Sequence, residues 1–247
     1  MFGEDGQRKI ESQHVGVVGL GGMGSQVVQG LAYFGVRWFV LVDDDRIDET
    51  NLNRVVGAYP QNIGRLKVEV ARDLIMAINP GAEVVAVPQN LRTRRAIELL
   101  LTCPVIFGCV DHDGPRLVLT ELAAAYEITL FDLATEIFLE TKERPFDFGG
   151  RVVVARPGDY WLFCADQIDR ELAKQDLETP EIRVQRRKHG YGLGSEIPAP
   201  SVFSLNGAIA NLALTEFLAM TTGIRDPARR LTYLGKRGAV RDTTDMG

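Results

Sequence analysis

The stretch VGVVGLGGMGS (residues 15–25) is the most informative part of the sequence for the fold. It joins a short run of β-branched residues to the start of a helical pattern, and Gly19, Gly21 and Gly24 follow the spacing G-x-G-x-x-G. Glycines at this spacing let the chain turn sharply after a strand and let the backbone approach a phosphate at the helix N-terminus. The stretch therefore predicts the first strand–turn–helix unit of a nucleotide-binding α/β fold.

Strand-like and helix-like patterns alternate from this stretch onward. Strands are expected at 15–20, 38–43, 83–88, 105–111 and 128–133, and helices within 25–36, 64–79, 93–101 and 114–127, with Gly35 ending the first helix. Runs such as VGVVGL (15–20) are apolar throughout, which is typical of a parallel sheet covered by helices on both faces. The pattern predicts a Rossmann-like, doubly wound, mostly parallel sheet.

The pattern changes after about residue 136. The later elements are two antiparallel strands in GGRVVVARP (149–157) and YWLF (160–163), a polar loop at 165–200 that begins with a short helix, a long apolar helix at 201–223, a strand at 230–235 and a loose tail at 241–247. We interpret the chain as a single domain, 1–247, with a nucleotide-binding half (1–136) and an antiparallel C-terminal half (137–247).

Composition narrows the classes of function. The chain has 28 Lys+Arg and 33 Asp+Glu, a net charge of −5, so it lacks the basic excess typical of nucleic-acid binding. We expect no membrane span, because no apolar run approaches about 18–20 residues, and the N-terminus lacks the apolar core of a signal peptide. A cytoplasmic protein is therefore expected. Three cysteines are too few for a four-cysteine zinc site, and Cys103 and Cys109 are expected to be buried, inert thiols.

Charged side chains at the predicted strand ends indicate the ligand. Asp43 ends the second strand and is placed to hydrogen-bond a ribose, which by itself points to a nicotinamide dinucleotide, although the same geometry also serves adenine mononucleotides. The segment DDDRIDETNLNR (43–54) then brings Asp45, Asn51 and Arg54 together; Lys67 begins the next helix, and Asp111 is followed by Arg116. Cations and a carboxylate near a nucleotide suit a triphosphate with Mg²⁺ better than hydride transfer.

These blocks resemble the ThiF/MoeB/HesA family, the bacterial relatives of ubiquitin-activating enzymes. The resemblance rests on FGEDGQRKIESQHVGVVGLGGMGS (2–25), LVDDDRIDETNLNR (41–54), GRLKVEVARDLIMAINPGAEV (64–84) and CVDHDGPR (109–116), and continues more weakly through GGRVVVARPGD (149–159) and SVFSLNGAIANLALTEFL (201–218). It spans nearly the whole chain and is strongest over 1–116.

The resemblance implies a reaction and a set of site residues. In the family, the terminal carboxylate of a small β-grasp carrier protein with a C-terminal Gly-Gly attacks the α-phosphate of ATP, and pyrophosphate leaves. Carried over by position, the resemblance implies a nucleotide loop of Gly19, Gly21, Gly22 and Gly24, ribose binding by Asp43, phosphate contacts from Asn51, Arg54 and Lys67, a less defined role for Asp45, and Mg²⁺ binding by Asp111. It further implies a homodimer, with carrier binding and dimer contacts in 137–247.

The sequence departs from the family in two ways. We expect the chain to lack the Arg-rich N-terminal segment that many relatives carry, so that either Arg8 or another residue substitutes for it or its contribution is absent. Trp161 stands about where relatives carry a first zinc cysteine. We therefore expect no structural zinc, and we interpret Cys164 as the remnant of a lost zinc pair that is not needed for catalysis.

Several alternatives remain open at this point. The substrate could be a peptide or a modified tRNA nucleoside, or the chain could be a non-catalytic partner subunit or a nicotinamide-dependent oxidoreductase. Asp43 and Asp45 could be solvated residues at a strand end, Arg54 and Lys67 surface charges, and Asp111 a helix N-cap.

Overall fold

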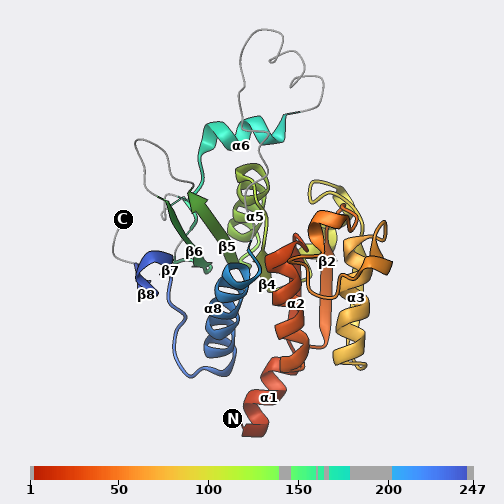
Figure 1. Cartoon of the computed structure of the whole chain (residues 1–247). Helices are drawn as coiled ribbons and strands as arrows, with labels where there is room; N and C mark the ends of the chain where they lie inside the picture. Colours follow the sequence, from red (N-terminus) through yellow and green to blue (C-terminus); the bar gives the residue numbers. More distant parts are fainter. Residues whose placement is uncertain (1–2, 139–145, 160, 164–166, 179–201, 244–247) are drawn as a thin grey trace, which may run out of the picture.

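The computed structural model describes residues 3–138, 146–159, 161–163, 167–178 and 202–243. One eight-stranded sheet runs through them, in the order β3-β2-β1-β4-β5-β6-β7-β8 (Figure 1). The strands are β1 (His14–Val18), β2 (Trp38–Val42), β3 (Glu83–Val87), β4 (Val105–Gly108), β5 (Thr129–Phe138), β6 (Asp147–Ala155), β7 (Arg230–Leu234) and β8 (Ala239–Asp242). The helices are α1 (Gly3–Glu11), α2 (Gly22–Phe34), α3 (Lys67–Ile78), α4 (Arg94–Leu100), α5 (Asp113–Ala125), α6 (Arg170–Leu177) and α8 (Phe203–Thr222), with single turns η1 (Glu49–Asn51), η2 (Pro60–Asn62) and η3 (Gly235–Arg237).

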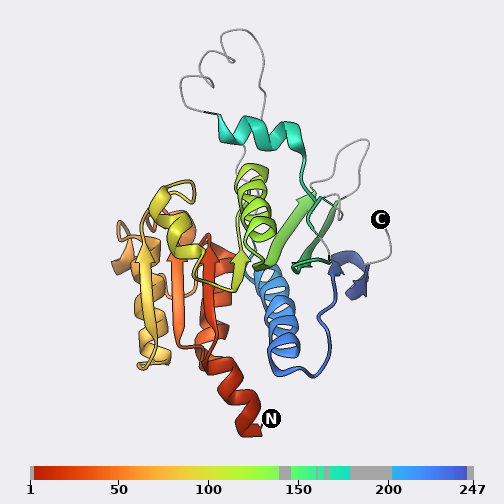
Figure 2. The same cartoon turned by 180° about the vertical axis from the view of Figure 1, so that it is seen from behind.

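The first five strands are parallel and the last three antiparallel, which confirms the predicted fold class. Helices α2, α3 and α8 cover one face of the sheet (Figure 1), and α4 and α5 cover the other (Figure 2). Each face has its own apolar core, because side chains alternate between faces along every strand: Val15 and Val17 lie in one core and Val18 in the other. Because β1, β2 and β4 are parallel neighbours, their carboxyl ends lie at the same edge of the sheet, and the loops that follow them lie together there.

Helix α8 anchors the antiparallel half to the parallel half. Phe217 on α8 packs edge-on against Phe107 of β4 and Phe131 of β5, with ring centroids 5.7 and 6.3 Å away. Within the residues that the structure describes, α8 is long and apolar enough to cross a membrane by length and composition alone, contrary to our expectation that no run comes close. More than half of its most apolar stretch is buried inside the molecule, as in the core helix of a globular domain.

Three local expectations were wrong or incomplete. We did not predict α1, whose short amphipathic pattern buries mainly Ile10. Residues 161–163 form a turn instead of the expected strand, although Leu162 is fully buried. The start of the expected tail lies in β8, because Arg241 and Asp242 pair with β7. The polar loop does begin with a helix, α6, but residues 179–201 and Cys164 lie outside the described residues.

Candidate nucleotide-binding site

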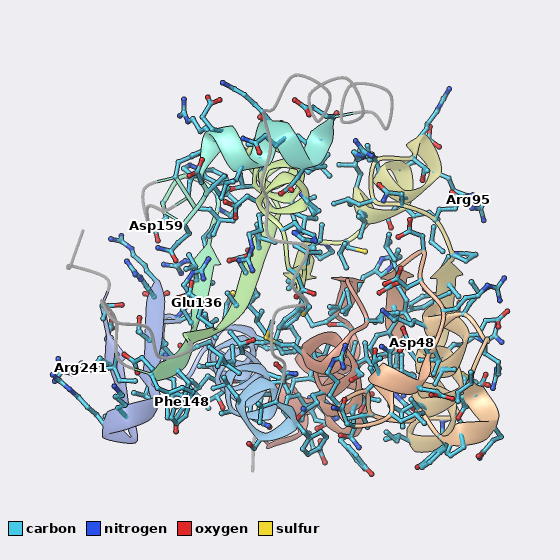
Figure 3. The ribbon with its side chains drawn as sticks, turned by 45° about the horizontal axis from the view of Figure 1, so that its top comes forward. Asp48, Arg95, Glu136, Phe148, Asp159 and Arg241 are labelled. Atoms are coloured by element: carbon cyan, nitrogen blue, oxygen red, sulfur yellow. The ribbon has the colours of Figure 1, made fainter. Side chains whose placement is uncertain are left out.

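One cavity of about 680 Å³ lies at the carboxyl edge of the parallel strands. Its walls come from the loops after β1, β2, β3 and β4 and from β5, α6 and α8; in Figure 3, Asp48 marks the segment after β2 and Glu136 marks β5. The residues expected in the site that line it are Gly19, Gly21, Gly22, Asp43, Asp45, Asn51, Arg54, Lys67 and Asp111. Gly24 alone among the expected residues lies behind the wall, inside the first turn of α2. The fold therefore gathers in one place residues that are up to 92 positions apart (Gly19 to Asp111) in the sequence.

The glycine loop is built by close backbone approaches. Gly19 has φ +84°, and a Cβ there would also lie 2.5 Å from the carbonyl oxygen of Cys109 on the neighbouring strand loop. A Cβ on Gly24 would run into the carbonyl oxygen of Gly19, so α2 can begin directly against the loop only with glycine at 24. The first N–H groups of α2 have no acceptor within the helix and lie at its positive end, beside the cavity. This is a suitable position for a phosphate.

Asp43 fixes the loop as well as facing the cavity. Its Oδ2 accepts the N–H of Leu20 at 2.6 Å, and its Oδ1 accepts the N–H of Asp45 at 2.8 Å. Burial raises the pKa of the Asp43 carboxyl, an effect that the nearby charge of Lys67 opposes. Each carboxylate oxygen can accept a further hydrogen bond, which leaves acceptors for a ribose hydroxyl pair. Asp43 is thus a half-buried structural acceptor, which excludes the view of it as a merely solvated residue.

Asp45 and Lys67 form an ion pair on the cavity wall. Lys67 Nζ lies 2.7 Å from Asp45 Oδ2, and the Lys67 N–H donates to the Asp45 carbonyl at 3.0 Å. The Lys67 side chain is only 11% exposed, whereas that of Asp45 is 68% exposed. Asp45 therefore orients an otherwise enclosed ammonium group, which gives this residue the defined role that the sequence did not supply.

Asn51 and Arg54 lie on the segment after β2. Asn51 is buried; its Oδ1 accepts the N–H of Asp48 at 3.5 Å and its carbonyl accepts the N–H of Arg54 at 3.0 Å. The guanidinium of Arg54 donates to the Thr50 carbonyl and, at 3.2 Å, to Asn53. The Arg54 side chain passes Gly22, where a Cβ would lie 3.2 Å from its Cγ. Asn51 thus shapes the turn that presents Arg54 beside the glycine loop.

Asp111 and Arg116 differ in their surroundings although both line the cavity. Asp111 is exposed, and it is not the helix N-cap considered above, because His112 occupies that position of α5. Arg116 is buried, and its guanidinium is bound to Asp132 at 2.6 Å and to the carbonyls of Val110 and Leu133. Our expectation that Arg116 adds a cation for the triphosphate is therefore wrong, since its charge is already neutralised inside the protein.

Sequence reasoning missed the residues that other elements add to the cavity. Asn90, Leu91 and Arg92 follow β3, Asn206 comes from α8, and Asp176 and Leu177 come from α6. The loop after β3 could have been found from the rule that the carboxyl ends of parallel strands share one edge. Asn90 donates to Asp44 at 3.3 Å. The carboxylates of Asp43, Asp44 and Asp45 lie within 4.8 Å of one another, but each has a donor within the protein.

The cysteines that the structure describes are buried. Burial raises the pKa of Cys103 to about 12 and raises that of Cys109 as well, which confirms the expectation of inert, protonated thiols. Cys164 lies outside the described residues, so its expected dispensability stays a prediction.

Comparison with known proteins supports the fold and the family resemblance. The ThiF family model matches residues 1–244. "Adenylyltransferase and sulfurtransferase UBA4" of Meyerozyma guilliermondii is 32% identical over 122 residues, and that of Saccharomyces cerevisiae is 34% identical over 128 residues. These matches cover 49% and 52% of this chain but only 29% of each relative. The chain therefore matches less than a third of the length of these relatives.

Solved structures share the fold at low identity. Escherichia coli MccB with ATP superposes with a TM-score of 0.73 at 17% identity, covering 96% of this chain and 64% of MccB. PaaA superposes with a TM-score of 0.70 at 19% identity, covering 96% of this chain and 74% of PaaA. With a family model that matches almost the whole sequence, the chain belongs to the ThiF family.

Proposed function

We propose that this protein is an ATP-dependent adenylyltransferase that activates the C-terminal carboxylate of a small carrier protein. The observation that carries the proposal is the single cavity that joins a glycine loop, a ribose-type carboxylate, two cations and an exposed Asp111. The name of the UBA4 relatives supports an adenylyl transfer. The lining of the cavity favours ATP over a nicotinamide dinucleotide, because Arg54 and Lys67 line it together with the glycine loop and two cations suit a triphosphate.

The reaction explains why cations gather here. A carboxylate oxygen of the carrier attacks the α-phosphorus of ATP, the bond from that phosphorus to the β-bridging oxygen breaks, and pyrophosphate leaves with the electron pair. The product is an acyl-adenylate. An anionic nucleophile must approach a polyanion, so Arg54, Lys67 and the N-terminus of α2 lower the barrier by neutralising phosphate charge in a preorganised site.

The donor chemistry of Asp111 fits Mg²⁺. It is an exposed carboxylate on the cavity wall, with no ion-pair partner within 4.0 Å among the described residues. Mg²⁺ is commonly held by one or two carboxylates together with substrate phosphates. When bound, Mg²⁺ would supply further neutralisation of the triphosphate. Asp111 would hold it in the loop between the end of β4 and the start of α5.

Strand β5 and helix α8 line another side of the cavity, and we place the acyl substrate there. Ala134 and Thr135 of β5 line it, and Thr135 donates to Asn206 of α8 at 3.4 Å. We infer that a β-grasp carrier with a C-terminal Gly-Gly threads its tail along this side, that the enzyme works as a homodimer, and that it resides in the cytoplasm. One of the MccB structures contains MccA together with AMPCPP, so MccB has a partner of its own. We keep a peptide as the competing substrate class.

ATP–pyrophosphate exchange tests the proposal. The purified protein is assayed with candidate β-grasp carriers ending in Gly-Gly, each paired with a variant that lacks the final Gly. Exchange that depends on ATP, Mg²⁺ and the intact carrier tail supports the proposal. Binding of NAD⁺ in preference to ATP in a calorimetric titration would contradict it. Exchange with a short peptide but with none of the carriers would assign the peptide class instead.

A further inference from the structure

Arg116, which lines the cavity, forms a buried ion pair with Asp132 of β5. Arg116 Nη1 lies 2.6 Å from Asp132 Oδ2, and the side chains are 6% and 1% exposed. The surrounding interface between α5 and the sheet is apolar, with Leu119, Ala123 and Leu130 fully or almost fully buried. A buried ion pair is seldom more stabilising than apolar side chains of similar volume, so stability alone is a weak explanation for it.

The same guanidinium holds the backbone next to Asp111. Arg116 Nη2 donates to the carbonyl of Val110 at 2.8 Å and to that of Leu133 at 3.3 Å. Val110 immediately precedes Asp111, and Leu133 immediately follows Asp132. Arg116 therefore joins the ends of β4 and β5 and fixes the peptide from which the Asp111 side chain projects.

We propose that Arg116, held in place by Asp132, is a positioning residue for Asp111 and thereby sets the affinity of the site for a divalent cation bound to nucleotide. The inference rests on the proposed function, since it assigns Asp111 to the metal. Partners in the shell around a metal ligand orient it, and their loss typically weakens metal binding by about 10–100-fold. The planar guanidinium reaches Asp132 with Nη1 and both carbonyls with Nη2, a fixed spread of donors that the single nitrogen of lysine does not reproduce.

Asp132 has a second effect on Asp111. Arg116 and Asp111 both line the cavity, and without its buried partner the positive charge of Arg116 would be attracted to the exposed Asp111 carboxylate. An Arg116–Asp111 pair would compete with the cation. By neutralising Arg116 inside the protein, Asp132 leaves Asp111 available as an anionic ligand.

Arg151 of β6 provides a matched control. Its Nη2 lies 3.6 Å from the same Asp132 oxygen, and its side chain is 11% exposed. It pairs in addition with Glu136 at 3.8 Å, on the part of β5 marked in Figure 3. None of the hydrogen bonds identified in the described part of the chain links Arg151 to the Val110 carbonyl. Loss of Arg151 thus disturbs the same buried charges without releasing the backbone beside Asp111.

The test measures metal binding directly. Mn²⁺ is titrated, with electron paramagnetic resonance as the readout, into wild type, Arg116→Lys, Asp132→Asn and Arg151→Gln in the presence of a non-hydrolysable ATP analogue. Calorimetry gives the affinity for the metal-free analogue, and thermal unfolding verifies that each variant is folded. We expect Arg116→Lys and Asp132→Asn to weaken Mn²⁺ binding at least about tenfold, while their affinity for the metal-free analogue stays within about threefold of wild type. Both affinities of the control, Arg151→Gln, should also stay within about threefold of wild type.

Two results would overturn the inference. One is unchanged Mn²⁺ affinity in a folded Arg116→Lys or Asp132→Asn variant. The other is an equal loss of Mn²⁺ affinity in Arg151→Gln, which would show that any disturbance of the buried charge cluster weakens metal binding. If Arg116→Lys fails to fold, Asp132→Asn carries the same expectation, because it removes the anchor and keeps the guanidinium. If wild type binds neither the analogue nor Mn²⁺, the proposed function itself fails, a result distinguishable from failure of the positioning role alone.

Discussion

Replacing Lys67 by Met tests the function of the cavity with little expected effect on the stability of the fold. Lys67 is the first residue of α3, and its N-cap, Leu66, offers no side-chain acceptor. A cation in the first turn opposes the helix dipole by about 0.3–1 kcal/mol. Its ion pair with the largely exposed Asp45 contributes about 0.2–1 kcal/mol in the opposite direction. Methionine keeps the apolar stem buried, so the net change in the free energy of unfolding should stay within about 1 kcal/mol.

The expected effect on turnover is much larger. An enclosed ammonium group that is 11% exposed and already oriented by Asp45 meets the triphosphate without a cost of reorganisation. Losing one such preorganised partner typically lowers the rate by about 10²-fold, roughly 2.7 kcal/mol of transition-state stabilisation. The melting temperature should move by no more than about 4 °C for a chain of this size.

Two assays on the same preparations decide the outcome. Thermal unfolding gives stability, and ATP–pyrophosphate exchange gives turnover. Arg65→Met is the matched control, because Arg65 lies two residues earlier and pairs with Asp73 at 2.6 Å without lining the cavity. Exchange by Lys67→Met within about threefold of wild type would refute the phosphate contact. A loss of stability above about 2 kcal/mol would show that Lys67 is chiefly structural.

Three further changes test the site. Asp111→Ala should lower ATP–pyrophosphate exchange by about two orders of magnitude or more, and full exchange would refute its assignment to Mg²⁺. Because burial raises the pKa of Asp43 in the folded state, its contribution to stability is present below its ordinary pKa and is lost as pH rises through the raised value. Urea unfolding should therefore show the stability of wild type relative to Asp43→Asn falling as pH rises through the acid range, and a constant difference would contradict this. The Cys164→Ala variant should retain exchange within about threefold of wild type. In this variant, iodoacetamide at pH 8 should leave Cys103 and Cys109 unlabelled until the chain is unfolded, as measured by peptide mass spectrometry. Labelling of the native protein would contradict the burial of these two thiols.

The parallel half of the fold could be predicted because its signals are local. Strand-length apolar runs alternate with helical periods, and Gly35 does end α2 in the left-handed conformation expected of a C-cap. Residues 161–163 show where such signals fail. Leu162 is fully buried and the run is apolar, yet it forms a turn, because an apolar run reports burial and not hydrogen bonding to a neighbouring strand.

The gathering of the site could also be predicted, since strand ends determine which loops meet. What the sequence could not supply is the direction in which a charge points. Arg54 and Arg116 follow strand ends in the same manner, yet one passes the glycine loop and the other turns into the core toward Asp132. The partner that decides this, Asp132, lies in the apolar run ITLFDL (128–133), where it looks like an ordinary residue at the end of a strand.

Long-range partners also determine the roles of the three consecutive aspartates. In the sequence they form one acidic cluster, but in the fold each carboxylate accepts a hydrogen bond from a different donor: Asp43 from the backbone of the glycine loop, Asp44 from Asn90 and Asp45 from Lys67. The cluster therefore links the end of β2 by hydrogen bonds to three segments that line the cavity: the glycine loop, the loop after β3 and the start of α3. In the proposed site, the anionic ligand for a cation is Asp111, in the loop after β4. By our inference, its availability depends on the buried Arg116–Asp132 pair, which keeps the Arg116 guanidinium from competing for it. The division between acids that hold the walls and the acid that faces the substrate thus arises from long-range partners, which no local pattern encodes.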